Sequence, residues 1–192
     1  MSNRYFNLLQ IVIVVFLLLI SLWIFPDINT DENSRLEFLQ AIVIGVTMLI
    51  YGYSTIKESN LSAKIGSIGF ALLMFSFLLR ELDVEEFALP EMMRYLLGKE
   101  GKNFTMFLLW GSYLVAYTSY VKNKIEKVKL YIISFEGMLW ICALLLLILS
   151  QLMDKNIFHM KYPINRYYEE FLELFSYLYI LLSSWVRIEK KN

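Results

Sequence analysis

Histidine and cysteine are almost absent from this chain, which has one of each, His159 and Cys142. A single histidine excludes a zinc-binding helix built on two histidines, and a single cysteine excludes an intramolecular disulfide and a cysteine-based metal site. The sequence also has no glycine-rich phosphate loop, no Gly-x-Ser-x-Gly elbow and no Cys–His pairing suited to nucleophilic catalysis. Most familiar enzyme chemistries therefore lack the residues to support them.

Charged residues are scarce as well, at 19% of the chain, while 58% of the residues are hydrophobic. The apolar residues form blocks of roughly 16 to 23, the length that a helix needs to cross about 30 Å of hydrocarbon. A membrane β-barrel would show segments of about ten residues with alternating polarity instead. The sequence therefore predicts an all-α integral membrane protein, a helical bundle in a single domain over residues 1–192.

We predict about six transmembrane helices and one short helix on the outer membrane surface. The first apolar block resembles a signal sequence, but it is about 20 residues long and no small-x-small cleavage signal precedes Pro26, so we expect it to be retained. Between the third and fourth spans, Pro90 favours a helix start and Gly98 a helix end, around apolar residues at helical spacing. The predicted spans are 6–25, 36–54, 64–82, 104–121, 130–152 and 168–186, and the interfacial helix covers 90–97.

The distribution of basic residues predicts the orientation of the bundle. With six spans, most basic residues fall on one side, which the positive-inside rule makes cytoplasmic. Both termini are then cytoplasmic, and we expect the chain in a bacterial cytoplasmic membrane. Topogenic charge and contact with anionic lipid are the expected roles of the lysine-rich turn at 122–129, with a specific partner site as the alternative. The basic residues on this side are Arg4, Lys57, Lys64, Lys122, Lys124, Lys127, Lys129, Arg187, Lys190 and Lys191.

Three of the predicted spans, the second, third and sixth, carry polar residues along one face. Counting at about 1.5 Å per residue from the basic ends places Gln40, Arg80 and Glu173 about 21 to 25 Å along their spans. These groups share one level near the outer boundary, where ionised side chains are costly unless paired or wetted and so point to function. The candidate polar site consists of Glu37, Gln40, Arg80, Glu81, Glu169, Glu170 and Glu173.

Two explanations compete for this layer. Acidic residues are common at helix starts, which covers Glu37, Glu169 and Glu170, and Arg80 would then extend outward to water. Glu173 fits this explanation least, because it lies more than a turn inside an apolar helix. The second explanation is that the layer is functional. Its carboxylates outnumber its one arginine, so the surplus negative charge requires a bound proton, a bound cation or a water-filled vestibule.

Other patterns have plainer explanations. Glu136, within the fifth span, is expected to pair with Lys129 or a tyrosine, or else to serve as a proton relay. His159 is expected to be exposed, with metal ligation as the alternative. The tyrosines and tryptophans predict an interfacial aromatic belt. Apolar stripes predict lipid-facing sides on the third span, through Ile65 and Leu79 among others, and on the sixth, through Leu174 and Leu178 among others.

Three functional hypotheses follow. The first is a non-enzymatic binding or accessory membrane protein whose outer layer binds a lipid headgroup, a cation or a membrane-protein partner, including a second copy. The second is a proton- or cation-coupled transporter or channel along the polar stripes. The third is a metal-dependent enzyme acting on a lipid headgroup, in which Glu37, Glu81 and Glu173 hold a divalent cation. The sequence leaves the cofactor undetermined, with a divalent cation as one candidate, and no nucleic acid is expected as a partner.

Overall fold

A computed structural model describes residues 35–82, 84–87, 89–99, 101–157, 159 and 164–189. The predicted span 6–25 lies outside these residues. The regular elements within them are all helical, which confirms the all-α class. They are α2 Arg35–Lys57, α3 Leu61–Glu81, the 3-10 helix η1 Val84–Glu86, α4 Glu91–Leu97, α5 Lys102–Tyr120, α6 Lys124–Ile133, α7 Phe135–Asp154 and α8 Ile164–Glu189.

Four of the described helices are long and apolar enough to cross a membrane, within α2, α3, α7 and α8. Their apolar segments are Leu36–Lys57, Leu61–Glu81, Phe135–Asp154 and Asn165–Ile188. They correspond to the predicted spans 36–54, 64–82 and 168–186 and to most of 130–152. Helix α5 covers the predicted span 104–121 except for its last residue, but it is not among the four.

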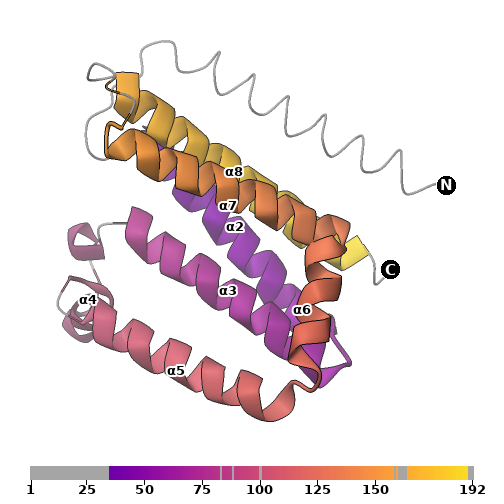
Figure 1. Cartoon of the computed structure of the whole chain (residues 1–192). Helices are drawn as coiled ribbons and strands as arrows, with labels where there is room; N and C mark the ends of the chain where they lie inside the picture. Colours follow the sequence, from indigo (N-terminus) through magenta and orange to yellow (C-terminus); the bar gives the residue numbers. More distant parts are fainter. Residues whose placement is uncertain are drawn as a thin grey trace.

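The helices lie side by side across the molecule. Figure 1 shows α5 at one edge, then α3 and α2, with α7 and α8 toward the opposite edge. Helix α8 packs against both α2 and α7, while α5 packs against α3. Helix α6 runs from the end of α5 to the start of α7, and α4 lies beside the start of α5 at the opposite end.

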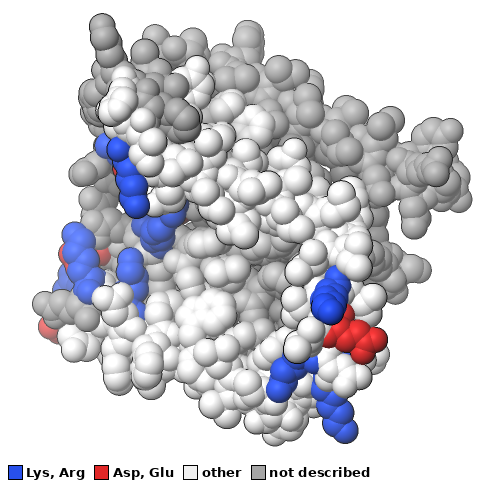
Figure 2. All heavy atoms as spheres, viewed as in Figure 1, with Lys and Arg blue, Asp and Glu red and all other residues white. Residues whose placement is uncertain are grey.

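The charged side chains on the face shown in Figure 2 gather toward the two ends of the helices, and the surface between them carries none among the described residues. This distribution is what a hydrocarbon layer requires, because an unpaired charge within it is costly. Together with the four apolar helices, it supports integration of the bundle in a membrane.

The predicted span 130–152 is wrong at its start, because the helix breaks at Ser134. The Ser134 hydroxyl accepts a hydrogen bond from the amide of Gly137 at 3.1 Å and donates to the Tyr131 carbonyl at 2.6 Å, so it caps α7 and closes α6. A β-carbon at position 137 would collide with the Tyr131 carbonyl oxygen, so glycine allows α6 and α7 to meet at this elbow. Residues 130–133 therefore belong to α6.

The buried core forms where α2, α3, α7 and α8 meet, around Ile44, Met74 and Ile180. The predicted lipid-facing stripes are wrong at several positions, since Ile65 and Leu79 on α3 and Leu174 and Leu178 on α8 are buried. Helix α3 has α2 on one side and α5 on the other, and α8 lies between α2 and α7. A helix with neighbours on two sides buries part of its apolar face as well as its polar one.

Candidate functional site

The predicted polar residues from α3 and α8 meet in a buried acid–arginine layer, defined here by Arg80, Glu81, Glu173, Tyr177 and Ser150. Arg80 donates to Glu81 Oε1 from Nε at 2.9 Å and from Nη2 at 2.7 Å, and Nη2 also contacts Glu173 Oε2 at 2.6 Å. The carboxylates are nearly enclosed, with side chains 7% and 6% exposed, whereas 42% of the Arg80 side chain is exposed. Arg80 thus pairs with two acids while it reaches solvent.

Two further side chains complete this layer. The Tyr177 hydroxyl donates to Glu81 Oε1 at 2.9 Å and accepts from Arg80 at 3.0 Å. Ser150, on α7, donates to Glu173 Oε1 at 2.9 Å. The layer therefore links α3, α7 and α8 through charge-assisted hydrogen bonds, which are stronger than those between neutral groups.

The remaining predicted residues lie beside the layer at the same end of the bundle. Gln40 is fully buried on α2 and donates to the Glu170 side chain at 3.0 Å and to its carbonyl at 2.9 Å. Glu37 lies 3.5 Å from Arg166, a second arginine that the sequence analysis did not include. Glu169 is partly buried and forms no ion pair with a described residue. The surplus of carboxylates is thus smaller than the sequence suggests.

A second charged cluster lies at the opposite end of α8. The side chain of Arg187 is only 12% exposed and contacts Glu136 Oε1 at 2.8 Å and Glu58 Oε1 at 3.8 Å. Its guanidinium lies 5.5 Å from the centre of the Phe70 ring, within the range of a cation–π interaction. The cation that pairs with Glu136 is therefore Arg187 from another helix, rather than the expected Lys129.

Polar side chains continue between the two clusters. The Tyr51 hydroxyl lies 3.4 Å from Ser183 Oγ and accepts from Trp140 Nε1 at 3.0 Å, and Ser183 donates to the Glu136 carbonyl at 3.2 Å. Ser176 is also fully buried. Polar residues thus extend along one face of α8 through the bundle, which matches its predicted polar stripe.

Tyr177 and Ser150 are the members of the layer that sequence reasoning missed. The sequence analysis assigned the tyrosines near span ends to an interfacial belt, whereas Tyr177 is almost completely buried. A usable signal exists for Tyr177, which lies four residues after Glu173 and so on the same helix face. Ser150 has no such signal, because its position depends on how α7 packs against α8.

No set of metal ligands is present within the described part of the chain. No group of three histidine, cysteine, aspartate or glutamate side chains is placed there to hold a metal ion, and His159 is exposed. Arg80 lies between Glu81 and Glu173, and Glu37 lies against Arg166. The three acids proposed as ligands are therefore each directed to a guanidinium.

No protein-family model, no curated protein and no solved structure matches this chain.

Proposed function

We propose that this chain is a small multi-pass membrane protein that acts by binding within the bilayer, as an accessory component without enzymatic chemistry. The observation that supports this most is that the buried polar side chains pair with one another. Arg80 joins Glu81 and Glu173, and Gln40 joins Glu170. Groups held in this way tie α2, α3 and α8 together. The expected partners are lipids, another membrane protein or a second copy of the chain.

A proton- or cation-coupled transporter or channel is the second candidate. The buried hydroxyl groups between the two charged clusters favour it, because a path for protons needs polar groups along its length. Ser54 Oγ and Ser176 Oγ are buried and have no hydrogen-bond partner within the described residues. The metal-dependent enzyme is not proposed, since the described residues supply no ligand set for it.

The two candidates differ in what Glu173→Gln changes. We expect liposomes containing the wild-type protein to show no flux of protons, sodium or potassium above protein-free liposomes. Glu173→Gln should lower the free energy of unfolding by about 1 kcal/mol, because it removes one ion pair with Arg80 but keeps the oxygen that accepts from Ser150. Thermal unfolding in nanodiscs measures this effect, and Mg²⁺, Ca²⁺ and Mn²⁺ should leave the wild-type transition unchanged.

Glu126→Gln, which removes an exposed acid on α6, is the matched control. Ion flux that is present in wild type and in Glu126→Gln but lost in Glu173→Gln would establish the transporter instead. Stabilisation by a divalent cation that disappears only in Glu173→Gln would assign cation binding to the layer.

We also propose six crossings in a bacterial cytoplasmic membrane, with residues 6–25 and α5 as the two additional spans. The 19 residues of α5 extend about 28 Å, and Phe104, Phe107 and Val115 are exposed on it, as lipid contact requires. Helix α4 then lies on the outer surface, and the α5–α6 turn and both termini lie in the cytoplasm.

Cysteine labelling tests this orientation. In a Cys142→Ser background, a membrane-impermeant maleimide added to intact cells should label Glu91→Cys and should label Lys122→Cys only after permeabilisation. Both positions are exposed at opposite ends of the bundle, so each serves as the control for the other. Labelling of Lys122→Cys in intact cells would reverse the orientation.

A further inference from the structure

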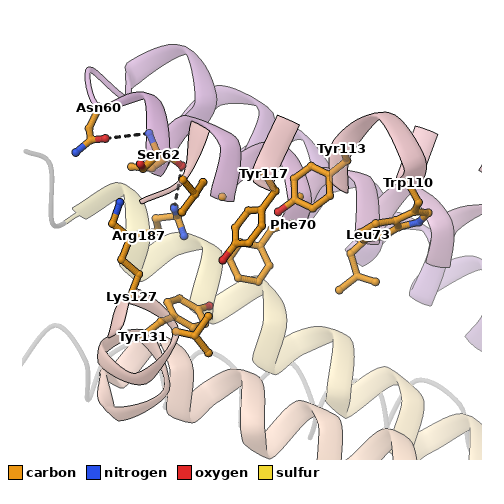
Figure 3. Close-up of a pocket in the computed structure, with 15 residues that line it drawn as sticks. Asn60, Ser62, Phe70, Leu73, Trp110, Tyr113, Tyr117, Lys127, Tyr131 and Arg187 are labelled. Carbon is orange, nitrogen blue, oxygen red and sulfur yellow. Dashed lines mark hydrogen bonds between the residues drawn. The ribbon is translucent and has the colours of Figure 1, made fainter. Parts of the chain in front are cut away.

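A cavity of about 460 Å³ lies between α3, α5 and α6, away from the acid–arginine layer. Its volume falls within the range of about 300 to 1,000 Å³ that is usual for ligand sites. Gly66 and Gly69 on α3 line one wall, where the Tyr113 side chain packs directly against Gly69 and a β-carbon at Gly66 would not collide with any atom. The ring of Phe70 lies beside them. Figure 3 shows Tyr113 and Tyr117 of α5 extending toward Phe70, with Tyr131 of α6 across the cavity.

The residues around the cavity divide into an apolar part and a polar end. Aromatic rings from three helices, with Leu73 and Val128, provide surfaces that suit a hydrocarbon chain rather than a hydrated ligand. Burial raises the pKa of the Tyr131 hydroxyl, so this ring stays uncharged and adds no negative charge. At the other end, Lys127 and Arg187 extend toward Asn60 and Ser62 (Figure 3).

The two cations at the polar end differ in whether acids of the protein already balance their charge. Arg187 is held between Glu136 and Glu58, so its charge is compensated within the protein. Lys127 is exposed and forms no ion pair with a described residue. Lys127 is therefore the side chain that can balance a negative charge on a ligand.

Helix α6, which supplies Lys127, has the character of a helix that lies on an anionic membrane surface. Ile125, Val128 and Ile133 are exposed on it and so are its lysines Lys127 and Lys129. The turn before it adds Lys122, and Glu126 is the one acid of this helix. Basic amphipathic helices bind anionic lipids through both kinds of side chain.

We propose that this cavity binds one anionic phospholipid, with its headgroup at Lys127 beside Asn60 and Ser62 and an acyl chain between the aromatic rings. A lipid fits both parts of the cavity, because its headgroup carries charge and its chain is apolar. The preference for an anionic headgroup follows from Lys127 and from the surrounding lysines of 122–129. This site is separate from the acid–arginine layer, and its test does not depend on the role proposed for that layer.

Lipid titration of the purified full-length chain in a neutral detergent tests the proposal. The probes are dioleoylphosphatidylglycerol, dioleoylphosphatidylcholine and inorganic phosphate, and the readouts are lipid retained in native mass spectrometry and the shift in thermal unfolding. We expect one retained phosphatidylglycerol, bound at least tenfold more tightly than phosphatidylcholine, and no shift with inorganic phosphate. Equal binding of the two lipids, or a shift with phosphate alone, would overturn the proposal.

Paired variants separate the cavity from general surface attraction. Gly66→Leu fills the cavity and should weaken phosphatidylglycerol binding at least tenfold, whereas Gly45→Leu, where an added β-carbon meets nothing within 4 Å, should not. If Gly66→Leu does not fold, Ala63→Leu fills the same cavity. Undiminished binding by a folded cavity-filling variant would contradict the site.

Charge reversal tests the headgroup contact. Lys127→Glu should weaken phosphatidylglycerol binding about tenfold, because a lysine near an anionic headgroup contributes roughly 1 kcal/mol and reversal adds repulsion. Phosphatidylcholine binding should change little. Lys129→Glu makes the same change in net charge on α6 at a position outside the cavity. An equal loss in both variants would show general attraction to the helix and overturn the proposed site.

Discussion

Arg80→Gln is expected to lower the free energy of unfolding by about 2 kcal/mol, whereas Glu81→Gln should leave it within about 0.5 kcal/mol of wild type. The arginine is the only cation in contact with Glu81 and Glu173 among the described residues. Its loss would leave two acids facing each other in a nearly enclosed space. Removing one partner of a buried pair costs about 3–5 kcal/mol, and we expect less because 42% of the Arg80 side chain is exposed.

Glu81→Gln should change the free energy of unfolding only slightly, because the hydrogen bonds to Glu81 converge on one oxygen atom. Nε and Nη2 of Arg80 and the Tyr177 hydroxyl donate to Oε1 of Glu81. A glutamine retains an oxygen at this position, and the arginine would still have Glu173 as its counter-ion. The substitution also removes the surplus negative charge of the layer, which offsets the weaker hydrogen bonds.

Thermal unfolding in nanodiscs measures the two variants against Arg94→Gln, which removes an exposed arginine on α4. Arg94→Gln should match wild type. The informative result is the difference between the losses of unfolding free energy in Arg80→Gln and Glu81→Gln. Similar losses in Arg80→Gln and Glu81→Gln would mean that Glu81 contributes its charge, and not merely an acceptor oxygen, to the fold.

Arg187→Met should destabilise the protein more, by about 3 kcal/mol, because this guanidinium is more deeply buried. Its side chain is 12% exposed, against 7% for Glu136 and 13% for Glu58. Methionine keeps most of the apolar stem but removes the charge beside both acids. Arg187→Lys should recover part of the loss, because lysine restores the charge without the planar group that lies against Phe70.

The double variant Arg187→Met/Glu136→Gln tests whether these two residues act as a pair. Neutralising Glu136 in the absence of Arg187 should restore about 1–2 kcal/mol of the free energy of unfolding, since buried pairs are replaced more easily together than singly. Lys129→Met removes an exposed cation near the same end and is the control. Strictly additive losses in the double variant would show that the contact at 2.8 Å contributes no coupling.

The helix break at Ser134 has a local sequence signal that the apolar residues around it obscured. Ser134 and Gly137 form a helix start that capping rules recognise. The apolar residues on both sides of them suggested one continuous span. Hydropathy measures only the length of an apolar segment, so it does not distinguish one helix from two that meet at an elbow.

Composition and periodicity alone determined that this chain is all-α, that several of its helices are long enough to cross a membrane, and that α8 has a polar face. These properties are local, because helix length and the angular position of a side chain depend on residues close in sequence. Only the tertiary structure decided that Arg80 lies between Glu81 and Glu173, that Arg187 contacts Glu136, and that three helices enclose an aromatic cavity. The periodicity of one helix gives the direction of a side chain around its own axis, but the neighbour that it meets depends on how separate helices pack.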